Sequence, residues 1–523
     1  MAIREDSTVP ETRLGMARLA MVAGLAALTL GIGLGHAGRL TYHEAFVAQA
    51  AREMVASGDV LVPTIGGRPW LEKPPMAVWL VALTDRLTGE STEWEARLPS
   101  AFAAVGLVLG VAALAAHRFG ATIGLLAGLV QATTAWTMIR GRLAEVDMLL
   151  ACLMTGTILA FDRMRDEVEE GSPRLWRWAF FVGLGLTALA KGIGFGAVLI
   201  LAVVALVLVW DRDREGLFDL KAIKGWGLAA LLSLAWPALV ALRYPKALEL
   251  WTLHVSDRVS AHPEHFAGGP WWQYGPALLW QVLPWTPLAL AGAWRSWHRA
   301  IEQPRGGDRL LWAWAVGPIA LLSLATVKNA HYAIYALPPW SIWTALSLAR
   351  FGARLHAWGW TALKIQRVAL AGFGVMGVGC GLGFGLLGSW FDHRGVEWAF
   401  YETAGRTLRT DEPLTLLYDD WDRNPYYTPF GPVPHDLAVR LYYLDRPASW
   451  RIGVDALLKQ PPAHGSAPFA VIGRDRDVPS LRRLGQVDTV LRGPKLRAHA
   501  SRVDDRAFVL YRVTPRVVAS TRP

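Results

Sequence analysis

A polar segment between the first two hydrophobic stretches carries side chains suited to proton transfer and phosphate chemistry. This segment, residues 39–99, contains His43 and Glu44 at the start of HEAFVAQAAREM, and Lys73 in the tetrapeptide EKPP. A carboxylate or an imidazole can take a proton from a hydroxyl group. An ammonium group can stabilise negative charge on a leaving phosphate. Holding such groups beside a membrane is costly unless they form a site, so the segment indicates an enzyme.

The first of these groups lies at a predicted helix start. Thr41 and Glu44 have the spacing of a capping box, in which a hydroxyl and a carboxylate satisfy free backbone N–H groups. Apolar residues then recur at helical spacing as far as Met54, and Gly58 ends the pattern. We therefore predict a juxtamembrane helix. Glu44 is either a general base or only a cap, and His43 is either a base or an exposed residue of the first turn.

The lysine of EKPP precedes two prolines. These prolines restrict the chain to an extended entry into the next element. The restriction holds the Lys73 ammonium near the membrane surface, at the level of a lipid phosphate. The alternative is that Lys73 only extends toward lipid headgroups, as lysines near helix ends commonly do.

A second acidic group lies in RLAEVD, where Arg142, Glu145 and Asp147 precede a long apolar stretch. A carboxylate buried at the end of a membrane span costs several kcal/mol if it has no partner. We therefore expect Asp147 to face a wet cavity or a cation. The alternative is that it caps its own helix.

Further cations occupy three other polar connections between apolar stretches. They are Lys191, the pair His254 and Arg258 four residues apart, and the group Lys328, His331 and Tyr332. Each cation alone would be an ordinary interface anchor. Placed with the acids at one membrane surface, they meet the needs of a reaction with a phosphate leaving group. Such a reaction needs a base for a hydroxyl proton and fixed positive charge where negative charge develops.

The composition indicates a polytopic membrane protein. Hydrophobic residues make up 53% of the chain and charged residues only 18%, against roughly 25% in ordinary soluble domains. The net charge of +10 does not indicate nucleic-acid binding, because no basic domain with interleaved aromatic residues carries it. Cys152 and Cys380 lie in apolar stretches, so neither a disulfide framework nor a thiolate metal site is expected. No other metal-ligand spacing is evident, and we expect that no metal or other cofactor is required.

Apolar runs of roughly 18 to 22 residues, which can cross about 30 Å of hydrocarbon, predict about eleven transmembrane helices. They are residues 19–35, 100–116, 123–139, 147–164, 175–189, 193–210, 226–242, 274–294, 310–327, 332–349 and 368–387. The first run has an alternative interpretation as a secretory signal, because arginines precede it.

Basic residues are distributed unequally between alternate connections. With a cytoplasmic N-terminus, the arginine-rich connections fall inside, as the positive-inside rule requires. The segment 39–99 and the connections 140–146, 243–273 and 328–331 then fall outside, as does the turn at Lys191. All the candidate residues should therefore lie at the outer face.

The composition becomes polar after the last span. Short β-like runs occur at 414–418, 469–473 and 508–513, with helical patterns at 435–443 and 454–459 between them. This pattern is typical of a small α/β domain. We therefore predict an all-α membrane domain over 1–388, with its first outer loop at 36–99, and an extracytoplasmic α/β domain over 389–523.

Several motifs resemble those of a known group of enzymes. YHEAFVAQAAREM, GDVLVPTIGGRPWLEKPPMAVWL and EWEARLPSA are similar to the first outer loop of bacterial polyprenol-phosphate-dependent membrane glycosyltransferases. These enzymes are the glycosyltransferase family 39 and lipid A aminoarabinose transferase group of the GT-C fold. GRLAEVDMLL, ALAKGIGFG, LHVSDRV and VKNAHYAIYALPP continue the resemblance in order to about residue 345.

The resemblance implies a reaction and roles for some residues. A sugar, hexose or pentose, would pass with inversion from a polyprenyl-monophosphate donor to a hydroxyl of a lipid, glycan or protein acceptor. The site would lie on the outer side of the bacterial inner membrane. Lys73 and Arg258 would hold the donor phosphate with Tyr332 nearby, Asp147 would match a second family carboxylate, and Lys191 and Lys328 would lie near the site.

One position departs from the family pattern. The family usually has Asp-Glu where this chain has His43-Glu44, and the missing Asp is generally assigned as the catalytic base. Glu44 is the first candidate to replace it, and His43 is the second, because an imidazole titrates near neutral pH. A third possibility is that the activity has been lost or redirected.

A transporter or flippase without glycosyl transfer is the alternative of another class. It would predict ionisable residues near helix centres, broken helices in paired repeats and short outer loops. The sequence shows none of these clearly.

Overall fold

The chain folds into two compact units, each built from two separate segments. The computed structural model describes residues 14–36, 38–170, 175–260, 269–388, 395–418, 427–428, 430–432, 434, 436–460, 462, 467–493 and 507–515. Met1–Ala37 and Leu71–Leu387 form the first unit, which we call the helical unit. Gly38–Trp70 and Gly388–Pro523 form the second, which we call the mixed unit.

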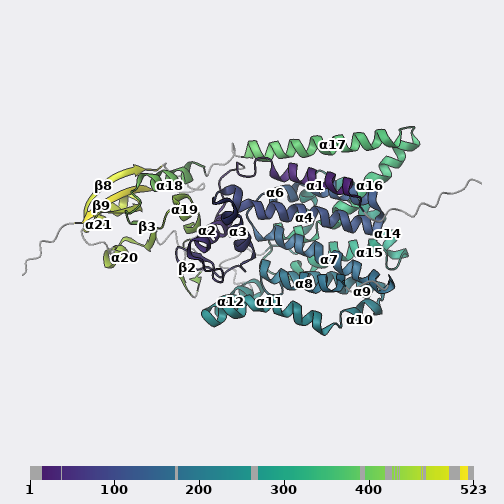
Figure 1. Ribbon diagram of the computed structural model, residues 1–523, viewed down its shortest axis with the longest axis horizontal. Helices are drawn as coiled ribbons and strands as arrows, with labels where there is room; N and C mark the ends of the chain where they lie inside the picture. The colour runs from purple at the N-terminus through teal and green to yellow at the C-terminus, as the bar shows by residue number, and fades with distance from the viewer. Residues whose placement is uncertain are drawn as a thin grey trace, which may run out of the picture. The chain divides into compact units, whose positions relative to one another are not determined.

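The helical unit is a bundle in which each predicted span overlaps a helix (Figure 1). Its elements are α1 (Met16–Gly31), α3 (Met76–Thr88), α4 (Glu93–Phe119), α5 (Ala121–Ala132), α6 (Ala135–Arg140), α7 (Val146–Glu170), α8 (Leu175–Lys191), α9 (Phe195–Asp211), α10 (Arg214–Asp219), α11 (Ile223–Arg243), α12 (Lys246–Ser260), α13 (Tyr274–Gln281), α14 (Thr286–Glu302), α15 (Gly307–Leu324), the 3₁₀ helix η1 (Ala330–Ala336), α16 (Pro338–Ala357), α17 (Ala362–Leu382) and η2 (Gly383–Leu387).

Within the described residues, three helices are by themselves long and apolar enough to cross a membrane. They are Glu93–Phe119, Ile223–Arg243 and Ala362–Leu387. Met16–Gly31, Ala121–Ala132 and Phe195–Asp211 are shorter apolar helices. The predicted helical fold is therefore confirmed, while the membrane crossing and the count of eleven spans stay predictions.

Close helix packing holds the bundle together. α7 packs against α4 and α8, α8 against α11, α9 against α15, and α14 against α16. At Gly292 in α14, an added Cβ would come within 2.1 Å of the carbonyl oxygen of Trp343 in α16. Only glycine permits this approach, and small residues at such contacts are typical of membrane helices.

Two predicted spans are each interrupted by a break. The run 123–139 divides into α5 and α6 at Thr133 and Thr134, and the run 274–294 divides into α13 and α14 around Pro284. Proline lacks an N–H group and ends a helix. The two breaks contact each other, because the N–H of Ala135 donates to the carbonyl of Leu283 at 2.9 Å. Polar backbone groups freed by the breaks thus find partners inside the bundle, as membrane proteins require.

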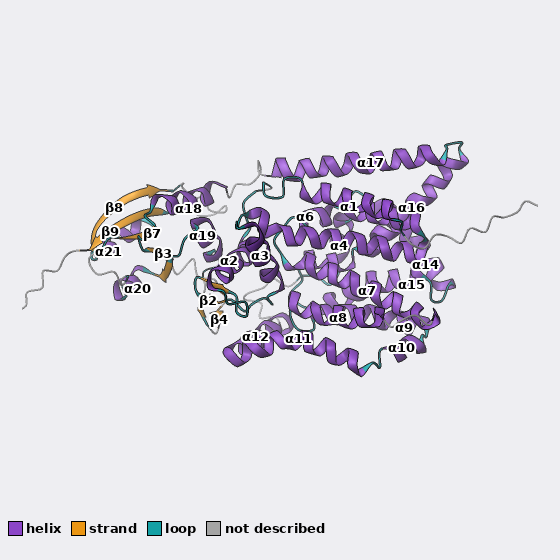
Figure 2. Ribbon diagram, viewed as in Figure 1, coloured by secondary structure: helices purple, strands orange, loops and turns teal. Residues whose placement is uncertain are grey.

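The mixed unit contains every strand in the described part of the chain (Figure 2). Its elements are α2 (Tyr42–Ser57), β1 (Thr64–Ile65), β2 (Arg68–Pro69), α18 (Gly395–Thr407), β3 (Leu414–Tyr418), β4 (Tyr427–Thr428), β5 (Gly431–Pro432), α19 (Leu437–Leu444), β6 (Ser449–Ile452), α20 (Val454–Lys459), β7 (Phe469–Gly473), η5 (Asp475–Asp477), α21 (Val478–Leu481), β8 (Gly485–Arg492) and β9 (Val509–Pro515).

The main sheet has the strand order β6-β3-β7-β9-β8. β6, β3 and β7 are parallel, and β9 pairs antiparallel with both β7 and β8. The central strands β3 and β7 are buried along their whole length, as their continuous apolar sequences predict. The predicted strands at 414–418 and 469–473 and the helix at 454–459 are confirmed, and β9 begins one residue later than predicted. The predicted helix at 435–443 is α19, and residue 435 itself lies outside the described residues.

Candidate functional site

A buried carboxylate forms the centre of the candidate site in the helical unit. Asp147, in the first turn of α7, is 5% exposed. The phenol of Tyr335 donates to its Oδ1 at 2.5 Å, and Nη2 of Arg140 donates to its Oδ2 at 2.8 Å. Lys191 forms a short ion pair with Oδ1, and Nε2 of His331 lies 3.6 Å from Oδ2. The expectation that Asp147 faces a cation is therefore confirmed.

Four helical elements bring these partners together. Arg140 ends α6, Lys191 ends α8, and His331 and Tyr335 lie on η1. Arg140 and Lys191 stand in the last turns of their helices, where the helix dipole favours a cation. Asp147 stands in the first turn of α7, where the helix dipole favours an anion. The local electrostatics of three helix ends thus supports the same arrangement.

Aromatic rings surround the ammonium of Lys191. Its Nζ donates to the Tyr335 hydroxyl at 3.0 Å and lies 3.9 Å from the ring centre of Tyr332. The rings of Phe195 and Tyr335 are also within range, at 5.2 and 5.4 Å. Cation–π contacts of this kind stabilise a partly desolvated cation. The Asp147 side chain and these rings therefore fix the direction of the ammonium.

The 3₁₀ helix η1 is itself held by three neighbouring helices. Gln281 of α13 donates to the carbonyl of Ala330 at 2.8 Å, and Trp136 of α6 donates to that of His331 at 3.4 Å. Trp314 of α15 donates to the carbonyl of Tyr335 at 2.8 Å. Short 3₁₀ segments leave carbonyls without helical partners, so these side chains hold the Tyr332 and Tyr335 rings in place.

The EKPP segment leads into the same group of helices. Pro75 is the N-cap of α3, and α3 packs against α7 and α8. Lys73 is half-buried, with its Nζ 3.9 Å from the carboxylate of Glu72. The indole of Trp251 in α12 donates to the carbonyl of Leu71 at 2.9 Å. α12 is the helix that carries His254 and Arg258 one turn apart, so the Trp251 side chain links this helix to the backbone just before EKPP.

Lys328 lies just before η1 and is partly exposed. Its Nζ donates to the carbonyl of Ala325 at 2.7 Å, and its own carbonyl accepts from Nε2 of Gln273 at 3.2 Å. Tyr332, four residues later, is buried. Of the predicted group, His331 therefore lies beside Asp147 and Tyr332 beside Lys191, whereas the Lys328 ammonium contacts the carbonyl of Ala325.

Arg142 contacts the end of α1 rather than Asp147. Its guanidinium donates to the carbonyls of Thr29 at 2.5 Å and Ile32 at 2.8 Å, at the end of α1. These carbonyls have no partners within the helix, and a basic side chain commonly caps them. The turn between α6 and α7 directs Arg140 rather than Arg142 toward Asp147. Arg142 therefore anchors α1, and its assignment to donor binding stays a prediction.

Glu44 and His43 lie in the mixed unit, on α2. The predicted capping box is confirmed: the N–H of Thr41 donates to Oε2 of Glu44 at 2.8 Å, and the N–H of Glu44 donates to Oγ1 of Thr41 at 3.2 Å. Gly58 ends α2 in a left-handed conformation, as predicted. Glu44 is fully buried, whereas His43 is exposed.

Two partners of Asp147 were not among the predicted site residues. Tyr335 follows Tyr332 by three residues, a spacing that places side chains on one face of a 3₁₀ helix. This spacing is the sequence feature that could have identified Tyr335 as a site residue. Arg140 lies two residues before the start of the motif RLAEVD, and nothing in the sequence distinguishes it from Arg142.

The arrangement suits the binding of an anion and the stabilisation of developing negative charge. Ammonium, guanidinium, imidazole and phenol groups converge around the Asp147 carboxylate, and charge-assisted hydrogen bonds to phosphate are strong. Within the described residues, no group of three or more His, Cys, Asp or Glu side chains is arranged to hold a metal ion.

Comparisons of sequence place this chain beside known glycosyltransferases. Residues 72–240 match the family described as dolichyl-phosphate-mannose-protein mannosyltransferase. The undecaprenyl phosphate-alpha-4-amino-4-deoxy-L-arabinose arabinosyl transferase of Edwardsiella ictaluri is 31% identical over 353 residues. That match covers 65% of this chain and 61% of the relative, so the chain spans about three fifths of the relative's length.

Comparisons of structure extend over almost the whole chain. ArnT from Cupriavidus metallidurans, in a crystal structure bound to undecaprenyl phosphate, matches with a TM-score of 0.71 and 18% identity, covering 95% of this chain and 97% of that one. The oligosaccharyltransferase AglB from Archaeoglobus fulgidus matches with a TM-score of 0.56 and 13% identity, covering 83% and 64%. The GT-C fold and the resemblance predicted from the motifs are confirmed.

Proposed function

We propose that this protein is an inverting glycosyltransferase that uses a polyprenyl-monophosphate sugar at the extracytoplasmic face of the bacterial inner membrane. The observation that carries the proposal is the cluster around Asp147. Cations from α6, α8 and η1 meet there, beside helices tied to the EKPP segment. Fixed cations at the end of membrane helices suit a lipid-linked phosphate, which is anchored at the same depth.

The proposed donor is undecaprenyl phosphate carrying a pentose, as named for the arabinosyl transferase relatives. We propose a lipid A hydroxyl as the first acceptor to test. The transporter alternative has less support, because residues 72–240, which contain Lys73, Asp147 and Lys191, match a mannosyltransferase family and the relatives are named as transferases.

The donor phosphate would contact Lys73, Arg258 and Lys328, with Tyr332 beside it. Asp147 would act as a positioning residue, because its carboxylate already accepts from Tyr335 and Arg140 and pairs with Lys191. It orients Lys191, Arg140 and His331 toward the place where charge develops. Fixed charges that need no reorganisation are the most effective stabilisers of a transition state.

We propose His43 rather than Glu44 as the general base. Glu44 is fully buried and its carboxylate accepts from the N–H of Thr41, so the capping box already uses it. His43 lies one residue earlier, and its side chain is exposed. In the proposed step, the imidazole takes the acceptor hydroxyl proton and the acceptor oxygen bonds to the anomeric carbon. The bond from that carbon to the phosphate oxygen breaks, and its electron pair leaves with the polyprenyl phosphate.

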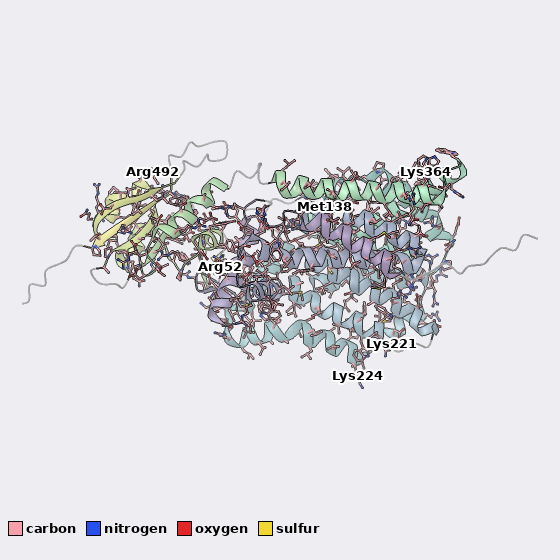
Figure 3. The ribbon with its side chains drawn as sticks, turned by 45° about the horizontal axis from the view of Figure 1, so that its top comes forward. Arg52, Met138, Lys221, Lys224, Lys364 and Arg492 are labelled. Atoms are coloured by element: carbon pink, nitrogen blue, oxygen red, sulfur yellow. The ribbon has the colours of Figure 1, made fainter. Side chains whose placement is uncertain are left out.

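The direct test supplies radiolabelled undecaprenyl-phosphate aminoarabinose and lipid A to the purified protein in proteoliposomes. Labelled lipid A and released undecaprenyl phosphate should form in equal amounts, and Lys73→Ala should abolish both. The matched control is Lys224→Ala, at an exposed lysine in the first turn of α11 (Figure 3), which should retain transfer. Movement of the labelled lipid between leaflets without a new glycosidic bond would support the transporter alternative.

A chelator tests the proposed independence from metals. The cations of the site supply the charge that a metal would otherwise provide, so we expect full transfer after treatment with EDTA. Activity that is lost with EDTA and restored by a divalent cation would contradict this proposal.

The orientation has its own test. In a background without Cys152 and Cys380, single cysteines at Ser57, Lys221 and Lys364 would each occupy an exposed position. An impermeant maleimide added to whole spheroplasts should label the cysteine at Ser57 and not those at Lys221 or Lys364, two residues labelled in Figure 3. The reverse labelling would place α2 in the cytoplasm and exclude an extracytoplasmic site.

A further inference from the structure

We propose that the C-terminal part of the mixed unit positions helix α2 for catalysis. α2 and the short hairpin that follows it come from the first outer loop, yet they fold with residues near the end of the chain. This inference rests on the proposed function, because α2 carries His43. It assigns a role to a domain whose purpose the sequence does not reveal.

The first anchor lies directly before the N-cap of α2. Arg39 forms a two-pronged ion pair with Glu402 of α18, with N–O distances of 2.6 and 2.9 Å. The backbone N–H of the next residue, Leu40, donates to the hydroxyl of Tyr443 in α19 at 2.7 Å. Planar two-pronged pairs of arginine and carboxylate fix orientation as well as distance. The chain entering α2 is therefore held in direction as well as in position.

Aromatic contacts reinforce this anchor. The Arg39 guanidinium lies 5.1 Å from the ring centre of Tyr443, and Trp398 stacks on that ring with an interplanar angle of 6°. Trp398 also meets the ring of Tyr42, the first residue of α2, edge to face at 5.9 Å. Tyr443 thus contacts Arg39 and Leu40, and Trp398 contacts Tyr42. These three residues surround the N-cap of α2.

The second anchor lies near the end of α2. Nη1 of Arg52, labelled in Figure 3, donates to the carbonyl of Tyr442 at 2.7 Å and lies 3.1 Å from the carboxylate of Asp445. Its guanidinium lies 4.3 Å from the Tyr442 ring centre. Between the two anchors, α2 packs along α19. Contacts at both ends of a helix prevent it from pivoting.

The hairpin after α2 supplies a third anchor. The carboxylate of Glu53, on α2, accepts from the Thr64 hydroxyl at 2.7 Å and from the N–H groups of Gly66 and Gly67 at 2.7 and 3.1 Å. The Arg68 guanidinium then lies 4.2 Å from the ring of Trp450 in β6. Both glycines have positive φ values, of 59° and 72°, which the tight turn requires. The hairpin therefore ties α2 to the main sheet.

These anchors exceed what the helix needs for its own stability. The capping box already satisfies N–H groups at the start of α2. The Leu40 N–H precedes the N-cap and belongs to no helical hydrogen bond. Its bond to Tyr443 and the pairing of Arg39 with Glu402 therefore fix where the helix begins. A displacement of a catalytic group by about 1 Å can lower a rate by about 100-fold.

A charge exchange tests the positioning role. Glu402→Arg and Arg39→Glu should each lower kcat of transfer by about 10- to 100-fold without changing KM for the donor, because the donor-binding residues lie in the helical unit. The double variant, which restores an opposite pair, should recover most of the rate. The control is Arg492→Glu, which breaks the exposed pair of Arg492 with Asp475 in the same unit and should leave kcat unchanged (Figure 3).

Hydrogen exchange gives a second readout that needs no transfer activity. Amide groups at 40–45 should lose protection in each single variant and regain it in the double variant, with Arg492→Glu as the control. Unchanged protection would overturn the anchor itself. Lost protection with normal kcat would overturn its catalytic role. A wild-type protein without transfer activity would contradict the proposed function alone, while the exchange pattern would still decide whether the C-terminal domain holds α2.

Discussion

Two charged clusters lie toward opposite ends of α7, and they are built differently. Asp147 is near the start of the helix and Asp162 is in its second half, about 22 Å away at a rise of 1.5 Å per residue. Near Asp162, a loop-end network joins the ends of α4, α7 and α9 to the start of α15. Its members are Arg118, Arg165, Arg305, Arg309, Asp162, Asp166, Asp211, Asp213 and Glu215.

In the loop-end network, each arginine pairs with carboxylates at close range. Arg118 contacts Asp162 at 2.6 Å, and Arg165 contacts Asp211 at 2.6 Å and Asp213 at 2.8 Å. Burial alone would raise the pKa of the Asp213 carboxyl. Hydrogen bonds from the Gly216 N–H and from Arg165, together with the charge of that arginine, lower the pKa below its usual value instead. Such paired, hydrogen-bonded charges form a structural clamp.

In the Asp147 cluster, several donors share the Asp147 carboxylate. Lys191, Arg140, Tyr335 and His331 all face Asp147, and Arg140 also pairs with Glu145. His331 keeps 32% of its side chain exposed. A shared carboxylate orients its cations while leaving them able to attract a further anion. The comparison therefore supports the proposal that one end of α7 stabilises the fold and the other end takes part in the reaction.

Among substitutions in the two clusters of α7, Lys191→Ala should have the largest effect on transfer. Loss of an oriented cation at the developing charge should lower kcat by about 1,000-fold. The measurement is single-turnover transfer in proteoliposomes, with the melting temperature as a check on folding. A variant that transfers at the wild-type rate would remove the distinction between the two clusters.

The pH dependence of transfer should identify the base. Imidazoles titrate about two pH units above carboxylates in model peptides, so wild-type kcat/KM should fall as pH decreases below about 6. His43→Asp should move this fall toward pH 4, and His43→Asn should lower kcat by about 100-fold. If the profile stays unchanged in His43→Asp and disappears in Glu44→Gln, then Glu44 is the base.

Asp213→Asn should lower the stability of the fold without lowering the rate of transfer. Removing one partner of a buried ion pair costs on the order of 3 kcal/mol, and transfer per folded molecule should stay unchanged. Because the folded-state pKa is lowered, the stabilisation exists above the unfolded pKa of about 3.9 and is lost as pH falls. The melting-temperature difference between wild type and variant should therefore shrink below about pH 4. A difference that persists below pH 4 would contradict the proposal that the ionised Asp213 carboxylate stabilises the loop-end network.

Arg142→Gln should give the smallest effect. It removes guanidinium bonds to the carbonyls of Thr29 and Ile32, which contribute about 1 kcal/mol each. We expect a modest decrease in melting temperature and an unchanged KM for the donor. An increase in KM of tenfold or more would return Arg142 to the donor site.

Much of the architecture could be predicted from the sequence because the bilayer imposes strong requirements. Apolar runs long enough to cross it correspond to helices, and the buried strands β3 and β7 show equally continuous apolar runs. The capping box at Thr41 and Glu44 could be predicted because it depends only on local spacing.

The remaining features depend on contacts between distant segments. Arg140 and Arg142 differ only in where the turn after α6 directs them, and no local pattern encodes this direction. The folding of residues 38–70 with the C-terminal domain rests on single partners such as Tyr443 and Glu402, which lie more than 350 residues along the chain. The interruption at Thr133 has no proline to mark it and depends on Leu283 across the bundle.

The contact between the two helix breaks has a consequence for how this sequence can vary. Straightening α5 into α6 would withdraw the Ala135 N–H from the Leu283 carbonyl and strand that carbonyl in a low-dielectric interior. A single substitution that repaired one break would thus destabilise the other. We expect the two positions to change together among descendants of this sequence, although they are far apart in the chain.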